Sequence, residues 1–240
     1  MLSCSMVLSV GINKHPMAYR IAILISGRGS NMLALADYAG QDAVDADIAV
    51  VIADQPAAGL DLARDRGIPT QLIDRSDYAN RHDHETAVMT AIDGARGDGD
   101  GVDGVFLAGY MRVLSARFCQ HYENRLFNIH PSLLPRHKGL DTHQRALDAG
   151  DERHGCSVHM VTAELDDGPV LLQRHVPVLK TDDATSLAAR VLVQEHMIYP
   201  MVLGALATGL LDTTDGKIDM KIGHLPGVIP NMQAPISWPE

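Results

Sequence analysis

The sequence predicts an α/β fold with a doubly wound, mostly parallel central sheet flanked by helices. Short runs of Val, Ile, Leu and Ala alternate along the chain with longer helical stretches, as expected when parallel strands are joined by crossover helices. The first run, residues 20–26 (RIAILIS), is almost continuously apolar and leads into a glycine-rich turn that opens a helix. Ligands bind at the carboxyl ends of the strands in such sheets, so functional residues are expected there.

Seven strands and six helices are expected in the alternating order that this architecture requires. The strands are the short apolar runs at residues 20–26, 47–53, 70–73, 102–108, 126–129, 158–162 and 170–178. The helices fill most of the intervening stretches, at residues 31–38, 56–66, 83–95, 115–122, 142–149 and 184–208. Pro56 and Gly67 bracket the second helix, since proline is favoured in the first turn and glycine just after the last. Residues 94–104 (GARGDGDGVDG) predict a surface loop.

Composition restricts the function classes. The chain has 240 residues, of which 46% are hydrophobic and 21% charged, which suits one large globular domain. We expect this domain at residues 19–211, after an N-terminal extension at 1–18 and before a C-terminal tail at 212–240 that packs on the domain or trails from it. The formal net charge of −10 argues against a nucleic-acid or anionic-membrane binder. No apolar run reaches the roughly 18–20 residues that span a bilayer.

Cysteine and histidine usage gives no sign of a metal centre. The three cysteines lack CxxC spacing, which predicts neither a zinc site nor a disulfide framework and favours a cytoplasmic location. The twelve histidines include no HExxH motif, so no metal is expected. Four of them lie near the motifs described below: His137, His143, His154 and His159.

The turn at residues 26–31 (SGRGSN) is the first candidate binding motif. It follows a strand and opens a helix, where backbone N–H groups and the helix dipole can bind an anion, and glycines allow the anion to approach the backbone. Met32 replaces the third glycine of the dinucleotide fingerprint, and no Walker lysine is present. We therefore expect a single phosphate monoester here. The alternative is an ordinary strand–helix turn with Ser30 as N-cap.

Asn128 and His130 form the second candidate motif, at the end of the strand over residues 126–129. Residues two apart in a strand point to the same side, and Pro131 ends regular pairing there. An amide beside an imidazole suits acyl transfer, because the amide can stabilise an oxyanion and the imidazole can move protons. The alternative is that His130 is a hydrogen-bonded structural residue.

An acidic turn, residues 164–169 (ELDDGP), is the third. Such a turn is most often only solvated. If Asp166 faces His130, its carboxylate favours the imidazolium and fixes the ring. The spacing in sequence leaves both interpretations open.

Taken together, these motifs resemble the phosphoribosylglycinamide formyltransferase family, folate-dependent enzymes of purine synthesis. The resemblance covers roughly residues 20–210. It is carried, in this order, by ISGRGSN at residues 25–31, LAGYMRVL at 107–114, NIHPSLLP at 128–135, ELDDGP at 164–169 and QEH at 194–196, followed by Tyr199-Pro200. The family has a Rossmann-like formyltransferase fold, which agrees with the predicted elements.

The resemblance implies a reaction and its catalytic residues. The amine of glycinamide ribonucleotide attacks the formyl carbon of 10-formyltetrahydrofolate, the formyl donor and co-substrate, in de novo purine synthesis. Asn128 is then expected to bind the formyl oxygen, and His130 to act as the general acid. Asp166 is expected to hold His130 charged and to relay protons through water.

The resemblance also implies the ligand contacts. The ribonucleotide phosphate is expected at Gly29, Ser30 and Asn31, and the ribose at Glu195. The folate pterin is expected along four residues of backbone and apolar side chains: Met111, Arg112, Val113 and Leu114. Arg81 is expected near the acidic tail of the folate, and His159 and Thr162 are expected to line the site. The expected partners are these small molecules alone, without nucleic acid or membrane, in a monomer or homodimer.

Three departures from the family pattern stand out. Lys138 and Asp141 occupy positions where a proline and a histidine are expected, which affects the substrate contacts of that loop. The terminal segments 1–18 and 212–240 have no counterpart in the family, and residues 94–104 are a local expansion.

Three other functions share parts of this pattern. A formyltetrahydrofolate hydrolase shares the Asn/His/Asp set but carries an N-terminal regulatory domain, for which residues 1–18 leave no room, and lacks this form of phosphate turn. A methionyl-tRNA formyltransferase needs a further C-terminal domain and a basic surface. A nucleotide-binding module without catalysis gives Asn128 and His130 no role.

Overall fold

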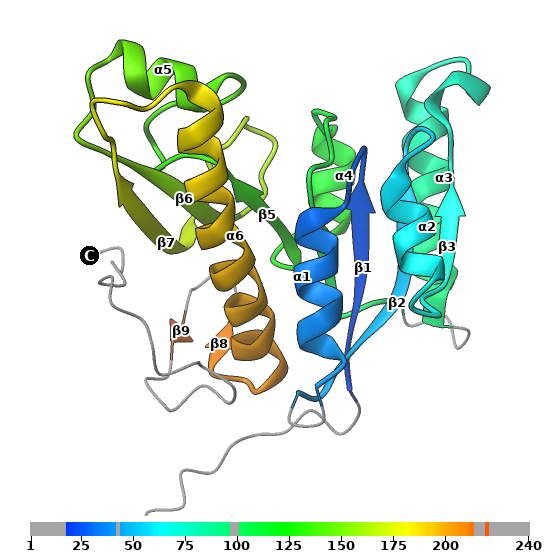
Figure 1. Ribbon diagram of the computed structural model, residues 1–240. Helices are drawn as coiled ribbons and strands as arrows, with labels where there is room; N and C mark the ends of the chain where they lie inside the picture. Colours follow the sequence, from blue (N-terminus) through cyan, green and yellow to red (C-terminus); the bar gives the residue numbers. More distant parts are fainter. Residues whose placement is uncertain (1–17, 42–43, 97–100, 214–218, 221–240) are drawn as a thin grey trace, which may run out of the picture.

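The computed structural model describes residues 18–41, 44–96, 101–213 and 219–220. Its main element is a seven-stranded sheet in the order β3-β2-β1-β4-β5-β6-β7 (Figure 1). The strands are β1 Tyr19–Ile25, β2 Ala46–Ala53, β3 Thr70–Leu72, β4 Gly104–Leu107, β5 Leu126–His130, β6 Arg153–Met160 and β7 Val170–Pro177. β1 to β5 are parallel, whereas β6 is antiparallel to both β5 and β7. The predicted doubly wound, mostly parallel sheet is confirmed.

Helices cover both faces of the sheet. The six α-helices are α1 Ser30–Ala39, α2 Ala58–Arg64, α3 Arg81–Asp93, α4 Ala116–His121, α5 Thr142–Asp148 and α6 Ala184–Ala207. Side chains of β1 alternate between two cores, as the period of a strand requires. Ile21, Ile23 and Ile25 pack with α1, α2 and α6, whereas Ala22 and Leu24 pack with α3 and α4. Figure 1 shows α1 and α6 next to each other on one side of the sheet.

The winding of the chain reverses between β1 and β4, which are neighbours in the sheet. Two hydrogen bonds join the segments that follow these strands: Ser26 N donates to the carbonyl of Gly109 at 3.1 Å, and Met111 N donates to Ser26 Oγ at 2.8 Å. The candidate phosphate turn and the candidate folate segment therefore lie side by side at the point where such sheets bind ligands.

Tyr199 connects α6 to the two central strands. Its side chain is fully buried, and its hydroxyl lies 3.0 Å from the carbonyl of Leu107 and 3.1 Å from that of Phe127, so that one proton is shared between two acceptors. Burial raises the pKa of this phenol. The contact joins the end of β4 and the first half of β5 to the long helix, next to Asn128.

The sequence misplaced two features. β6 begins at Arg153, five residues before the predicted start at residue 158. The added part contains Gly155, where a Cβ would lie 1.9 Å from the carbonyl oxygen of Arg174, so close strand approach requires glycine. Leu211–Asp212 (β8) also pairs with Asp219–Met220 (β9), which the sequence did not predict.

The predicted terminal segments lie largely outside the described residues. Of the expected extension at 1–18, the structure describes residue 18 alone, and of the tail at 212–240 it describes 212–213 and 219–220. Within the predicted loop at 94–104, residues 97–100 also lie outside the described part. The proposed division into extension, domain and tail stays a prediction.

Candidate active site

The turn after β1 leads into the N-terminus of α1, where the backbone N–H groups have no side-chain cap. Gly29 has a φ of 76° and precedes α1 without any side-chain cap, so Ser30 is the first helical residue and its predicted role as N-cap is wrong. A Cβ on Gly29 would lie 2.9 Å from the Cα of Gly59 on α2. Glycine is therefore required both by the left-handed backbone and by the close contact. The uncapped N–H groups at the start of α1 can bind an anion.

Asn31 and Glu195 meet beside this turn, although 164 residues separate them. Both side chains are buried, and Asn31 Nδ2 donates to Glu195 Oε2 at 2.7 Å. Burial raises the pKa of Glu195, and the hydrogen bond from Asn31 opposes this rise. Oδ1 of Asn31 is buried and has no hydrogen-bond partner among the described residues. An acceptor of this kind can bind a hydroxyl or amine of a ligand.

The orientation of the Asn128 amide is fixed by His159, its partner across the β5–β6 pair. Burial lowers the pKa of His159, so its ring is neutral at pH 7. Nδ1 of that ring lies 2.9 Å from the carbonyl of Met160 and must donate to it, which leaves Nε2 as an acceptor. Asn128 Nδ2 donates to this Nε2 at 3.1 Å. The second N–H of the amide stays available.

His130 and Asp166 lie together, which was one of the two interpretations of the acidic turn; the other was a turn that is only solvated. His130 Nδ1 is 3.4 Å from Asp166 Oδ2, and both side chains are less than 10% exposed. Asp166 Oδ1 lies 3.7 Å from His159 Nε2, so the three residues share one cluster with Asn128. Asp166 adopts a left-handed φ of 48°, and Gly139 N donates to its Oδ2 at 2.8 Å.

The other nitrogen of His130 also faces an oxygen. Its Nε2 donates to the carbonyl of His137 at 3.1 Å. Because a carbonyl oxygen can only accept, Nε2 carries a proton, while the carboxylate of Asp166 faces Nδ1. A ring held between two oxygens in this way has the fixed direction that proton transfer needs.

The candidate folate segment lies between β4 and α4. The side chains of Met111 and Val113 are largely exposed, whereas Leu114 packs in the core. Arg81, in the first turn of α3, forms an ion pair with Glu85 at 2.9 Å. Glu85 also accepts hydrogen bonds from the backbone and hydroxyl of Ser115, directly after the segment. Glu85 thus places Arg81 near the end of this segment, a contact for which the sequence gave no signal.

Thr162 is exposed, and its hydroxyl donates to the carbonyl of Glu164 at 3.4 Å, at the start of the acidic turn. The sequence did not identify Gly59 or Glu85, which contact Gly29 and Arg81. Among the described residues, no group of three or more His, Cys, Asp or Glu side chains is placed to hold a metal ion. No helix in the described ranges is long and apolar enough to cross a membrane.

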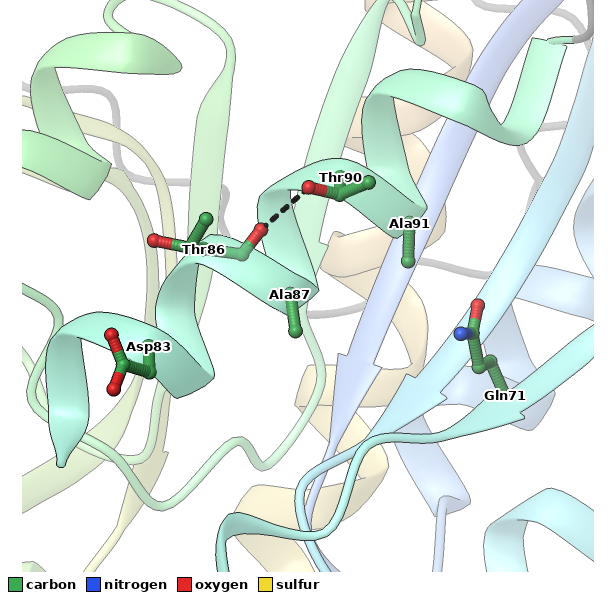
Figure 2. A pocket seen from close by; sticks show the side chains of 6 residues that line it. All are labelled: Gln71, Asp83, Thr86, Ala87, Thr90 and Ala91. Atoms are coloured by element: carbon green, nitrogen blue, oxygen red, sulfur yellow. Dashed lines mark hydrogen bonds between the residues drawn. The ribbon is translucent and has the colours of Figure 1, made fainter. Parts of the chain in front are cut away.

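A separate hollow lies at the β3 edge of the sheet (Figure 2). Five of its lining residues come from α3 and one from β3: Asp83, Thr86, Ala87, Thr90, Ala91 and Gln71. The hydroxyl of Thr90 donates to the carbonyl of Thr86 at 2.9 Å, which satisfies that polar group within the helix. No predicted site residue lines this hollow, and Asp83 is the one ionisable residue that does, so we assign it no part in the chemistry.

Comparisons with known proteins show the family of this chain. The formyl transferase family model matches residues 19–203. Phosphoribosylglycinamide formyltransferase of Escherichia coli K12 is 45% identical over 192 residues, which is 80% of this chain and 88% of that protein. The chain belongs to the phosphoribosylglycinamide formyltransferase family. It is an enzyme of the transferase class, and its fold is the Rossmann-like formyltransferase fold.

Solved structures of the family extend this agreement. The phosphoribosylglycinamide formyltransferase of Brucella melitensis shares 48% identity and a TM-score of 0.74, covering 82% of this chain and 99% of that one. Glycinamide ribonucleotide transformylase 1 of Symbiobacterium toebii shares 37% identity and a TM-score of 0.80, covering 86% and 95%. The resemblance inferred from the sequence motifs is confirmed at the level of family, fold and enzyme class.

Proposed function

We propose that this enzyme transfers the formyl group of 10-formyltetrahydrofolate to the amine of glycinamide ribonucleotide. The observation that carries the proposal is the cluster of Asn128, His130 and Asp166 beside a phosphate-type turn at the switch point of the sheet. An amide donor, a protonated imidazole and a carboxylate are the groups that acyl transfer to an amine requires.

The amine nitrogen of the ribonucleotide attacks the formyl carbon, and the available N–H of Asn128 stabilises the negative oxygen of the tetrahedral intermediate. The bond from the formyl carbon to N10 of the folate then breaks, and N10 takes a proton from His130. The attacking nitrogen loses one of its protons, which returns to His130 through water held by Asp166. Asp166 stabilises the imidazolium throughout, because its carboxylate faces Nδ1.

The ribonucleotide occupies the start of α1. Its phosphate accepts hydrogen bonds from the backbone of Gly29, Ser30 and Asn31, and the helix dipole favours the negative charge. The ribose hydroxyls lie against Glu195, whose carboxylate is held by Asn31. The unpartnered Oδ1 of Asn31 supplies a further acceptor.

The folate lies along the segment after β4. Its pterin contacts the backbone of Met111, Arg112, Val113 and Leu114, and the exposed Met111 and Val113 side chains offer it apolar surface. Arg81 interacts with the acidic tail, in the place where Glu85 holds it. We expect a cytoplasmic enzyme without a metal, as a monomer or homodimer.

A spectrophotometric assay of folate product, with and without glycinamide ribonucleotide, tests the proposal. Product that depends on the ribonucleotide supports the transferase. Product from the folate alone supports the hydrolase that the sequence left as an alternative. Equal rates with and without the ribonucleotide contradict the proposal.

A further inference from the structure

The segment that follows β5, residues 131–141, is anchored near its start by β6 and β7. Leu134 N donates to Ser157 Oγ at 3.0 Å, and that hydroxyl donates to the carbonyl of Ser132 at 2.6 Å. Gln173 on β7 also donates to the carbonyl of Leu134 at 2.9 Å. These contacts leave the second half of the segment, which contains His137 and Gly139, to be positioned by other residues.

Asp151, just before β6, supplies that second anchor. Its carboxylate is 4% exposed and accepts two charge-assisted hydrogen bonds from the segment. Arg136 Nη2 donates to Oδ1 at 2.6 Å, and His137 Nε2 donates to Oδ2 at 2.7 Å. The Arg136 side chain is 62% exposed, whereas His137 is 12% exposed. The contact with His137 is therefore the shielded one, and it is expected to constrain the segment more strongly.

The constrained residue is the one that touches the catalytic imidazole. His137 has a left-handed φ of 53°, and its carbonyl oxygen accepts the hydrogen bond from His130 Nε2 at 3.1 Å. Two residues later, Gly139 N donates to the Asp166 oxygen that faces His130 Nδ1. One short segment thus sets the acceptors at both ends of the His130 ring.

We propose that His137 and Asp151 are positioning residues for the acid–base step: their buried hydrogen bond holds the His137 carbonyl against His130 Nε2. The proposal rests on the proposed function of His130 as the general acid. In this role they act on His130 and not on the substrates, by fixing the direction of the imidazole. Because proton transfer depends steeply on geometry, their loss affects turnover more than substrate binding.

Two substitutions at His137 isolate this role. His137→Gln keeps an N–H donor for Asp151, whereas His137→Met has a similar length without the donor. Both are unbranched, so the left-handed backbone affects them similarly. We expect His137→Met to lower kcat about tenfold or more, with both KM values within about twofold of the parent. His137→Gln is expected to retain most of the parental kcat.

Arg136→Met is the matched control, because it removes the exposed partner of the same carboxylate and leaves His137 in place. Its kcat is expected to stay within about twofold of the parent. Circular dichroism establishes that each variant is folded. A folded His137→Met with parental turnover overturns the proposal, and so does a His137→Gln variant as impaired as His137→Met.

Nitrogen-15 NMR of the His130 ring, without substrate, separates this proposal from the proposed function. Its signals are assigned by their loss in His130→Gln. We expect the Nε2 shift to change and its proton to exchange faster in His137→Met, but not in Arg136→Met. An unchanged ring signal in His137→Met overturns the positioning role even if formyl transfer is confirmed. If the parent fails to form product with the ribonucleotide, the proposed function fails, while the ring signals still decide the positioning role.

Discussion

Asp166 Oδ2 lies 3.4 Å from Nδ1 of His130, 36 positions earlier in the chain, and also accepts a hydrogen bond from Gly139 N. The carboxylate is buried with the ring that it faces. This relationship joins the end of β5 to the turn between β6 and β7, and it gives the acidic turn a chemical partner.

Replacing Asp166 by Asn keeps the shape of the side chain and removes its charge. If the carboxylate holds His130 as an imidazolium, kcat is expected to fall roughly 10²-fold or more, as for loss of acid–base catalysis. Ribonucleotide affinity in calorimetry is expected to stay near the parental value, because Asp166 acts on the intermediate. Weakened binding with near-normal turnover contradicts the assignment.

Replacing Asn128 by Ala removes the proposed oxyanion donor. We expect kcat to fall about 10²–10³-fold, the usual loss for one such donor. His159→Gln is a useful comparison, because glutamine can still accept from Asn128 with its amide oxygen. Single-turnover kinetics separate the chemical step from product release. A rate for Asn128→Ala within tenfold of the parent means that the oxyanion is stabilised elsewhere.

Replacing Asn31 by Leu leaves the buried carboxylate of Glu195 without its 2.7 Å donor. A buried group left unsatisfied costs about 1–3 kcal/mol, so the free energy of unfolding is expected to fall by that amount. Ribonucleotide affinity is expected to fall too, by about tenfold, because both residues contribute to its site. Calorimetry and urea unfolding measure the two effects. Unchanged affinity would mean that the Asn31 side chain and Glu195 do not contribute to the ribonucleotide site.

Two glycines in the same turn give a matched stability test. Gly29→Ala puts a Cβ on a left-handed backbone 2.9 Å from the Cα of Gly59, which is expected to cost about 1–2 kcal/mol or more of folding free energy. Around Gly27, a Cβ meets no described atom within 4 Å, so Gly27→Ala is expected to change stability by less than about 0.5 kcal/mol. Equal effects on unfolding contradict this account of the turn.

His154 provides a pH prediction. It is 1% exposed, and burial, followed by the nearby His143 and His137, lowers its pKa from 6.5 to about 4. The unfolded chain therefore binds more protons at this residue between these values, so its contribution to stability falls as pH drops from 6.5 toward 4. His154→Gln is expected to lose less stability than the parent between about pH 7 and about pH 5 in thermal unfolding. An equal or larger loss contradicts the prediction.

Much of the fold could be predicted because its signals are local. The apolar run of β1 and the glycine turn after it are adjacent in sequence, and their physical consequences do not depend on the rest of the chain. The early start of β6 was not predicted, and the fit of Gly155 inside that strand depends on the backbone of Arg174 on β7, which is distant in sequence. A glycine required by close strand approach and a glycine that breaks a strand look the same in sequence.

Site residues that share one local motif could be predicted from the sequence. Contacts between residues far apart in the chain could not. Asn128 and His130 share a strand, so their common side follows from its period. The sequence left open whether Asp166 faces His130, since the acidic turn lies between β6 and β7, whereas His130 ends β5. Asp151 gave no signal and His137 stood out only as one of four histidines near the motifs, because their importance lies in one carbonyl and one buried hydrogen bond.

The ribonucleotide dependence of folate product tests the central claim most directly. The parent enzyme is assayed with 10-formyltetrahydrofolate, with and without glycinamide ribonucleotide, beside the His130→Gln variant. We expect rapid release of tetrahydrofolate only when the ribonucleotide is present. In His130→Gln the rate of release is expected to fall about 10²-fold or more. Release at the same rate without the ribonucleotide, or an unimpaired His130→Gln variant, would contradict this claim.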